Sequence, residues 1–364
     1  MVTFLPTRPG RLADVPSYER TIGGAESNVA CALAGAGHSV KWLSQVGADG
    51  FGDHLVEAIG AYGVDTSGVR RDPARPTGIY FRTATDRADD VHEVAYYRAG
   101  SAASALAPGS LPYGDLWAGR VLHLSGITPA LSAGCLALTR ELTRPAAGRP
   151  LLSFDINHRP GLWRDADGAR VLLDLARGAD LVFVGEDEAA EAWGVHGADA
   201  IRAALPEPAT LVVKRGAEGA VAYTRASGAD RASGADRASG ADRPGGTERP
   251  GGTERTSGMD RTNDPGDTVT SVPALRVEVV APVGAGDAFA AGFLSATLRG
   301  LDVAARLRHG HLMAAATLTV PGDLAVPPAR DLADRLAALD EEEWGTLRLA
   351  PGWTGPGEPE VRTP

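Results

Sequence analysis

Short apolar runs alternate with helix-like stretches over residues 122–320, and this alternation constrains the fold more than any other feature of the chain. The clearest apolar runs are residues 121–124, 151–154, 181–184 and 211–214. Runs of this length without polar alternation are typical of strands buried on both faces of a parallel sheet. We therefore predict an α/β fold with three layers, in which helices cover both faces of a mostly parallel central sheet.

Composition and charge narrow the class of protein. The 364 residues include 36 Lys and Arg against 46 Asp and Glu, a net charge of −10, without a basic run, so we expect no nucleic acid partner. No apolar stretch approaches the roughly 18 residues of a membrane span and no signal peptide precedes the first proline, so we expect a cytoplasmic protein with no membrane partner. Cys31 and Cys135 lack metal-ligand spacing, and we interpret them as buried thiols.

Polar residues gather where the predicted strands end. These clusters are residues 126–128, 155–159, 185–188, 214–216 and 284–287. Ligands of open α/β sheets bind at the carboxyl ends of the strands. Five polar strand ends are hard to explain by packing alone, so we predict a ligand site at this edge of the sheet.

The last cluster carries the candidate catalytic residues Gly284, Ala285, Gly286 and Asp287. It follows an apolar strand and opens a helix of small residues, so the glycines let successive amides point at an anion near the positive helix end. Asp287 would accept a hydroxyl proton while the amides and a metal ion stabilise a transferred phosphoryl group. The alternative is an ordinary helix start that Asp287 caps.

Two segments upstream of the sheet predict a lid. Residues 77–83 and 91–98 alternate in the strand manner around an Asp-rich turn, which indicates an antiparallel hairpin. Tyr80, Tyr96 and Arg98 would reach inward from it, although an exposed tyrosine on a β-surface is the alternative. Ahead of the hairpin, residues 23–28 would let a ligand approach the backbone, with Asn28 bonding hydroxyl groups, or else they only begin a helix.

Residues 226–261 stand apart as six hexapeptides that each end in an acid and an arginine. They have almost no apolar side chain to offset the entropy of ordering. We therefore expect residues 226–267 to be a disordered, low-complexity and functionally inert insertion within a domain of residues 1–341. A docking segment for a partner is the alternative. The Pro- and Gly-rich residues 342–364 are expected to form a flexible tail.

Three segments resemble the ribokinase and phosphofructokinase-B family of sugar kinases. They are residues 23–28, the Val-Gly-x-Asp-x-Phe-Gly run at 46–52, and residues 282–289. Further motifs at 77–80, 96–102, 124–129, 155–159 and 162–163 are similar to those of 2-keto-3-deoxygluconate kinases. The resemblance implies a ribokinase-like fold with a small β-sheet lid (about residues 2–22 and 72–100) and a homo-oligomer formed through the lid. It also implies that residues 1–6 begin where a first strand of the family's sheet is finishing.

The resemblance further implies ATP-dependent phosphorylation of 2-keto-3-deoxy-D-gluconate at its 6-hydroxyl, with Mg²⁺. Matched position by position, the substrate residues are Gly24, Asn28, Tyr80, Tyr96, Arg98, Ile127, Arg159 and Asp323. The ATP side comprises Asn157, Lys214, Gly216, Gly219, Gly284, Gly286 and His311, and no metal ligand is assigned. Ala281, Gly185 and His311 depart from the family pattern, which usually has an acid at the first position and Asn or Ser at the other two.

The residues themselves favour a sugar acid as acceptor. Arg98 and Arg159 are planar donors suited to a carboxylate, which a neutral hexose lacks. The alternative for Arg159 is a salt bridge to Asp155 or another acid, and Lys214 to Gly219 could be a plain turn. Two other functions stay open: a kinase of a neutral sugar or nucleoside, and a non-catalytic sugar-acid-binding protein.

Overall fold

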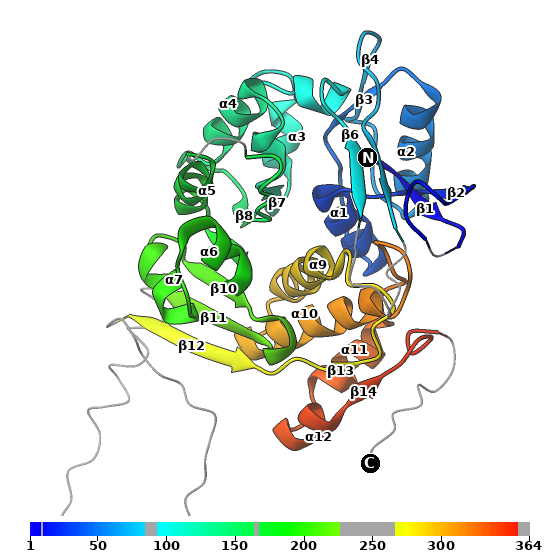
Figure 1. Ribbon diagram of the computed structural model, residues 1–364. Helices are drawn as coiled ribbons and strands as arrows, with labels where there is room; N and C mark the ends of the chain where they lie inside the picture. The colour runs from blue at the N-terminus through cyan, green and yellow to red at the C-terminus, as the bar shows by residue number, and fades with distance from the viewer. Residues whose placement is uncertain (9, 84–92, 164–166, 226–265, 356–364) are drawn as a thin grey trace, which may run out of the picture.

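The computed structural model describes residues 1–8, 10–83, 93–163, 167–225 and 266–355 (Figure 1). Its main sheet has six strands in the order β12-β11-β10-β9-β8-β7. The parallel strands are β7 (Val121–Ser125), β8 (Leu151–Asp155), β9 (Leu181–Gly185) and β10 (Thr210–Lys214). The antiparallel strands β11 (Ala220–Arg225) and β12 (Asp267–Val272) extend one edge. The prediction of a mostly parallel central sheet is confirmed.

Helices cover both faces of this sheet because successive apolar side chains of a strand point to opposite faces. Val182 and Val184 of β9 pack in one core with α5 (Gly168–Arg177), α6 (Glu186–Trp193) and α7 (Ala198–Ala204). Leu181 and Phe183 pack in the opposite core with α1 (Ala25–Gly35), α9 (Ala285–Leu298), α10 (Val303–Leu318) and α11 (Arg330–Ala337). The three-layer α/β/α architecture is therefore confirmed (Figure 1).

Two shorter helices complete the core beside β7. Leu116 of α3 (Tyr113–Ala118) and Leu138 of α4 (Ala133–Leu142) form a cluster against Leu122 and Leu124. Cys135 belongs to the same cluster. Both cysteine thiols are free and buried, as the sequence predicts.

The lid is a separate sheet of four strands in the order β2-β1-β5-β6. Its strands are β1 (Val2–Pro6), β2 (Tyr18–Ile22), β5 (Ile79–Arg82) and β6 (Val94–Tyr97). β5 and β6 form the antiparallel pair that the alternating pattern predicts, whereas residues 84–92 of the hairpin lie outside the described part of the chain. Val2 to Pro6 pair with β2 and β5, so β1 and β2 lie within the lid range of about residues 2–22 that the resemblance implies, and residues 1–6 do not finish a strand of the main sheet.

A short parallel pair connects the lid to the main domain. It consists of β3 (Gln45–Gly47) and β4 (Arg70–Asp72), and α2 (Gly50–Ala61) lies between them in the chain. Asp49 caps α2 by accepting the amides of Phe51 and Gly52. Its other carboxylate oxygen accepts the Thr77 amide at 2.8 Å, so the Val-Gly-x-Asp segment ties α2 to the strand that enters the lid.

The C-terminal segment differs from the expected flexible tail. α12 (Glu341–Thr346) has a capping box at Asp340, and β14 (Arg348–Leu349) pairs in parallel with β13 (Arg276–Val277). Trp344 is 1% exposed and its indole donates to the Pro273 carbonyl at 2.9 Å. Burial of this ring and of Trp353, which is 6% exposed, offsets part of the entropy of ordering residues 342–355. Residues 356–364 lie outside the described part of the chain.

The hexapeptide segment begins and ends at neighbouring strands. β11 and β12 are antiparallel neighbours, and their last register pair is Arg225 with Asp267. Asp267, which the sequence assigned to the insertion, instead starts β12 and forms a buried bidentate ion pair with Arg202 at 2.7 and 2.9 Å. The expectation of disorder for the rest falls on residues 226–265, outside the described residues. Within the described ranges, none of the helices has the length and apolarity that crossing a membrane requires.

Candidate active site

The head of α9 is built for close approach to the backbone. Gly284 precedes the helix with φ of 81°, and a Cβ there would lie 2.2 Å from the Asp323 carbonyl oxygen, so only glycine fits. Among the residues that the structure describes, no side chain caps this helix end. The first-turn amides of Ala285, Gly286 and Asp287 are therefore available to an anion, which favours the anion-binding reading over a capped helix start.

Asp287 lies in the first turn of α9 and is partly buried. Its Oδ2 accepts a hydrogen bond from the Asn28 amide of α1 at 2.8 Å. Removal from water raises the pKa of Asp287 to about 7, with Asp155 and Asp323 adding to the rise and Asn28 and Lys214 opposing it. A carboxylate poised near neutrality is suited to accept a proton from a substrate.

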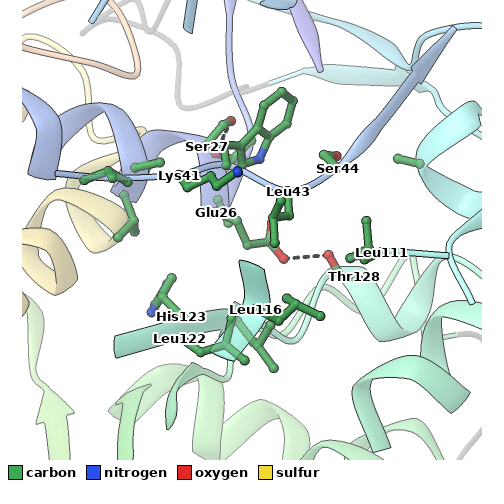
Figure 2. Close-up of a pocket in the computed structure, with 18 of the residues that line it drawn as sticks. Glu26, Ser27, Lys41, Leu43, Ser44, Leu111, Leu116, Leu122, His123 and Thr128 are labelled. Carbon is green, nitrogen blue, oxygen red and sulfur yellow. Dashed lines mark hydrogen bonds between the residues drawn. The ribbon is translucent and has the colours of Figure 1, made fainter. Parts of the chain in front are cut away.

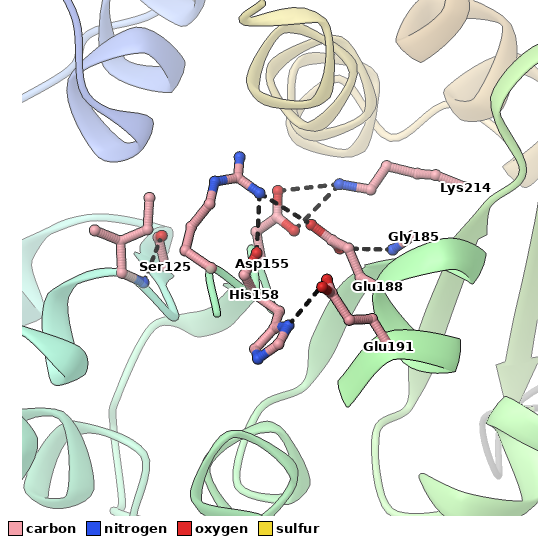
Figure 3. Close-up of polar contacts among 9 residues, drawn as sticks. Ser125, Asp155, His158, Gly185, Glu188, Glu191 and Lys214 are labelled. Atoms are coloured by element: carbon pink, nitrogen blue, oxygen red, sulfur yellow. Dashed lines mark hydrogen bonds and ion pairs between the residues drawn. The ribbon is translucent and has the colours of Figure 1, made fainter. Parts of the chain in front are cut away.

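Lys214 brings a positive charge to the same place (Figure 3). It ends β10, and its Nζ donates to both carboxylate oxygens of Asp155, at the end of β8, at 3.2 Å each. A Cβ placed on Gly286 would lie 3.5 Å from this Nζ, so the ammonium sits beside the amides of α9. Together the ammonium and the helix end form an environment that attracts phosphate.

Asn157 occupies a strained position two residues beyond β8. It has a φ of 42°, is 5% exposed, and its Oδ1 has no hydrogen-bond partner within the described residues. Asparagine tolerates the left-handed region better than most residues. Strain of this kind concentrates at functional sites, and the free oxygen offers a ligand contact at the strand ends.

Two arginines from different elements act on each other through their charges. Arg98 follows β6, is 9% exposed, and its guanidinium stacks on the Tyr96 ring at 4.1 Å. Burial lowers the pKa of Arg98, and the charge of Arg159 lowers it further. Arg159 is half exposed and approaches Glu188 at 3.8 Å. The alternative to a substrate role for Arg159 was a salt bridge to Asp155 or another acid, and the acid that it approaches is Glu188, because Asp155 is bonded to Lys214.

Tyr80 and Asp323, both expected at the substrate, are bonded to each other. The Tyr80 hydroxyl donates to Asp323 Oδ2 at 2.6 Å, and Arg82 donates to Asp323 Oδ1 at 3.0 Å. Burial is the main reason that the pKa of Tyr80 is raised, so the phenol stays protonated. This buried network joins the lid strand β5 to the loop that supports Gly284, and Arg82 is a member that sequence reasoning missed.

A cavity of about 720 Å³ opens beside the substrate-side residues (Figure 2). Gly24, Arg98 and Ile127 line it, together with Glu26, which accepts a hydrogen bond from Thr128 at 2.5 Å. Its remaining walls are mainly apolar. They include β7, which is the edge strand of the main sheet. Asp287 and Lys214 do not line the cavity, so the catalytic candidates, at the head of α9 and the end of β10, lie outside it.

Of the other residues expected on the nucleotide side, Gly216 and Gly219 lie in a turn and His311 lies in the core. Gly216 and Gly219 have φ of 55° and 118°, and a Cβ on Gly219 would lie 2.2 Å from the Val272 carbonyl, so the turn itself requires glycine. His311 is 7% exposed, with its ring edge-on to Phe289 and its Nε2 near the Val272 carbonyl. Burial lowers the pKa of His311 to about 4. Its visible contacts are those of a neutral core histidine.

Sequence reasoning also left two acids of the site without a role. Asp155 and Glu188 both lie in the polar strand-end clusters, which was the signal for them. Glu188 Oε2 accepts the Gly185 amide at 2.8 Å, so Gly185 begins α6 through this contact. Within the described residues, His, Cys, Asp and Glu side chains form no group of three or more able to hold a metal ion.

The fold and site define a class of protein. A three-layer α/β domain with an uncapped helix N-terminus, an aspartate and a lysine at its strand ends is the arrangement of a phosphotransferase that acts on a small molecule. The pfkB family carbohydrate kinase model matches residues 2–235 and 257–330. The chain belongs to this family and is a sugar kinase.

Similarity to individual proteins extends over nearly the whole chain. A 2-dehydro-3-deoxygluconokinase of Bacillus subtilis (strain 168) is 32% identical over 93% of this chain and 93% of its own length. One of Thermoproteus tenax is 31% identical over 91% of this chain and 90% of its own. The structure is similar to that of a putative ribokinase II from E. coli in complex with ATP and Mg²⁺, with a TM-score of 0.72 and 21% identity, covering 92% of this chain and 95% of that one.

Proposed function

We propose that this sugar kinase transfers the γ-phosphoryl group of ATP to the 6-hydroxyl of 2-keto-3-deoxy-D-gluconate, which gives 2-keto-3-deoxy-6-phosphogluconate. The observation that carries the choice of a sugar acid is the pair of guanidinium groups of Arg98 and Arg159, whose positive charges act on each other. An anion bound between two such like charges would offset their repulsion. A sugar-acid carboxylate meets that need, and a neutral sugar does not. The two kinases above, named for this substrate, support the same choice.

The reaction assigns a role to each group at the head of α9. Asp287 takes the proton of the 6-hydroxyl as its oxygen bonds to the γ-phosphorus and the bond to the ADP oxygen breaks. The amides of Ala285 and Gly286 and the ammonium of Lys214 stabilise the negative charge on the transferred group. The lid excludes water, which would otherwise accept the phosphoryl group.

ATP is proposed to lie along the ends of β8 and β10, toward Asn157, Lys214, Gly216 and Gly219. Mg²⁺ usually keeps several waters and binds substrate phosphates with only one or two carboxylates. Glu188, in the first turn of α6 beside the end of β9, is the carboxylate that would hold the ion, and no cluster of three acids is needed. When bound, Mg²⁺ would neutralise charge on the phosphate oxygens. Because ATP is the phosphate donor, we place the protein in the cytoplasm.

Coupled ADP release tests this assignment directly. The acceptors to compare are 2-keto-3-deoxygluconate, its galactonate epimer, gluconate, fructose, ribose and adenosine. We expect the highest kcat/KM with one of the two 2-keto-3-deoxy acids. A preference for fructose, ribose or adenosine would instead assign a neutral-sugar or nucleoside kinase. Thermal stabilisation by the sugar acid without stabilisation by ATP and Mg²⁺ would favour a non-catalytic binding protein.

We also propose that the chain forms a homo-oligomer through the lid. The lid face opposite Tyr80 carries Phe4 stacked on Phe81 at 4.7 Å, with Tyr18 and Tyr97 edge-on to Phe81. Tyr97 is 64% exposed, and exposed aromatic rings of this kind mark contact surfaces. Analytical ultracentrifugation should show a dimer that Tyr97→Glu dissociates, and a monomeric parent would contradict it.

A further inference from the structure

Asp155 is a buried acid at the end of β8 that the reaction above does not use. It is 3% exposed, and both of its carboxylate oxygens accept hydrogen bonds from Lys214 Nζ at 3.2 Å (Figure 3). These two hydrogen bonds of equal length fix the orientation of the Lys214 side chain. The lysine crosses the space between β10 and β8, which are separated in the sheet by β9.

The contact between Asp155 and Lys214 matters because it holds the Lys214 ammonium next to α9. Nζ lies beside the first turn of the helix, 3.5 Å from where a Cβ of Gly286 would be. The base Asp287, in the same turn, takes its side-chain hydrogen bond from Asn28 instead. The lysine is therefore in reach of a phosphate at the helix end while its own hydrogen bonds go to Asp155.

We propose that Asp155 is a positioning residue, which holds Lys214 at the head of α9 where it meets the transferred phosphoryl group and restrains it from pairing with Asp287. This inference rests on the proposed function. Without Asp155, the ammonium would turn to the nearest remaining carboxylates. A base that is salt-bridged to a lysine is a weaker proton acceptor.

The charged groups around Asp287 come from several elements. Asp155 of β8 and Asp323 of the loop after α10 raise its pKa, and Lys214 of β10 lowers it. Glu188 of α6 acts on Lys214. Loss of Asp155 thus removes one negative neighbour and frees a positive one, and both changes lower the pKa of Asp287. Loss of Lys214 acts in the opposite direction.

The test compares the two partners of the pair with a matched control. Asp155→Asn and Lys214→Met each break the pair at the site. Asp267→Asn breaks the buried bidentate pair with Arg202, which lies at the other end of β10 and cannot reach Asp287. The readouts are kcat, KM for ATP and the acidic limb of the kcat/KM profile against pH, with the acceptor that the parent enzyme prefers.

We expect Asp155→Asn to lower kcat by about tenfold or more and to shift the acidic limb to lower pH, with a raised KM for ATP. Lys214→Met should shift the limb to higher pH, and Asp155→Glu should restore part of the activity. Asp267→Asn should lower Tm but leave the limb in place. An Asp155→Asn enzyme with an unmoved limb and kcat within about threefold of the parent would overturn the proposal.

A folding failure or a wrong acceptor would not hide the result. If Asp155→Asn does not fold, an unmoved limb in Lys214→Met still overturns the inference. If the parent enzyme rejects every sugar acid, the proposed function fails. The role of Asp155 is then tested by the same kinetic measurements with whichever acceptor the parent enzyme phosphorylates. In addition, stabilisation by ATP and Mg²⁺ without any sugar should be smaller in Asp155→Asn than in Asp267→Asn, and equal stabilisation would count against the role of Asp155.

Discussion

At the scale of single residues, Asp287 combines two properties that compete. Its carboxylate must be ionised to accept a proton, yet withdrawal from water favours the protonated form and raises its pKa to about 7. The stabilising contact that remains is the amide of Asn28 at 2.8 Å. The cost of ionising this group is the physical reason that it is a strong base at neutral pH.

Asp287→Asn should separate these two properties. We expect kcat to fall by about 10²- to 10⁴-fold, the usual contribution of a general base. Because the folded pKa is raised, the stability due to the protonated form is lost as pH rises through about 7. The Tm of Asp287→Asn should therefore rise relative to that of the parent between about pH 4 and about pH 7, and the difference should stay constant above that. A Tm difference that is constant throughout would show that the carboxylate ionises without penalty.

The same raised pKa predicts the pH dependence of the parent enzyme. The free enzyme needs ionised Asp287, so kcat/KM for the sugar should increase with pH and level off above a midpoint near 7. Steady-state rates in a constant-ionic-strength buffer series measure this limb. A midpoint near the ordinary aspartate value of about 4 would contradict the withdrawn environment of Asp287.

Arg98 is the residue that we propose to select a negatively charged substrate. Arg98→Ala removes a guanidinium that is 9% exposed and stacked on Tyr96, and Arg98→Lys keeps the charge without the planar fork. Loss of a charged hydrogen bond predicts a KM for the sugar acid raised by about 10- to 100-fold in Arg98→Ala. The KM of any neutral sugar that is accepted should change little. Equal increases for both would argue against carboxylate recognition.

At the scale of elements, the C-terminal segment shows where sequence reasoning met its limit. The high Pro and Gly content after Trp344 predicts fraying, yet α12 and β14 are anchored by two tryptophans that are 1% and 6% exposed. Burial of both rings offsets part of the entropy of ordering this segment. The partners of Trp344, such as the Pro273 carbonyl and the guanidinium of Arg308, are distant in sequence. A local sequence pattern therefore does not predict these contacts.

Trp344→Ala should therefore destabilise the whole domain and not only its end. We expect a loss of about 3–5 kcal/mol of unfolding free energy in urea denaturation, the usual cost of deleting a buried tryptophan. Trp117→Ala is the matched control, since Trp117 is only partly buried on α3 and its ring contacts Tyr113 at the surface. Equal small losses in both variants would mean that the C-terminal segment contributes little.

At the scale of the whole molecule, the main sheet continues on both sides of the hexapeptide segment. Arg225 and Asp267 are register partners, so a two-residue turn suffices to join β11 to β12. Replacing residues 226–266 by Asn-Gly should leave kcat within about twofold of the parent and Tm within about 3 °C. Calorimetry and the ADP assay measure both. A large fall in either would give the segment a role in folding or activity, contrary to the inert insertion that its composition predicts.

The layers of the fold could be predicted from the sequence because each strand has a local pattern of apolar residues. Continuous apolar runs at β8, β9 and β10 predict burial on both faces, and the polar residues that follow them predict the functional edge. The partners of the side chains at that edge were not accessible. The sequence predicted Lys214 on the nucleotide side and Arg159 at the substrate, but it did not predict that Lys214 would bond to Asp155 or that Arg159 would approach Glu188. These choices depend on directions and distances between strands that are far apart in the chain.

The sequence by itself therefore determined the three-layer architecture, the lid hairpin and the glycine turn before Asp287, because local periodicity and backbone sterics are properties of neighbouring residues. Only the tertiary structure decided which charges meet. The Asn28 to Asp287 contact spans 259 positions and the Tyr80 to Asp323 contact spans 243. Withdrawal from water and the pKa of a base arise from such long-range packing, which no local pattern encodes.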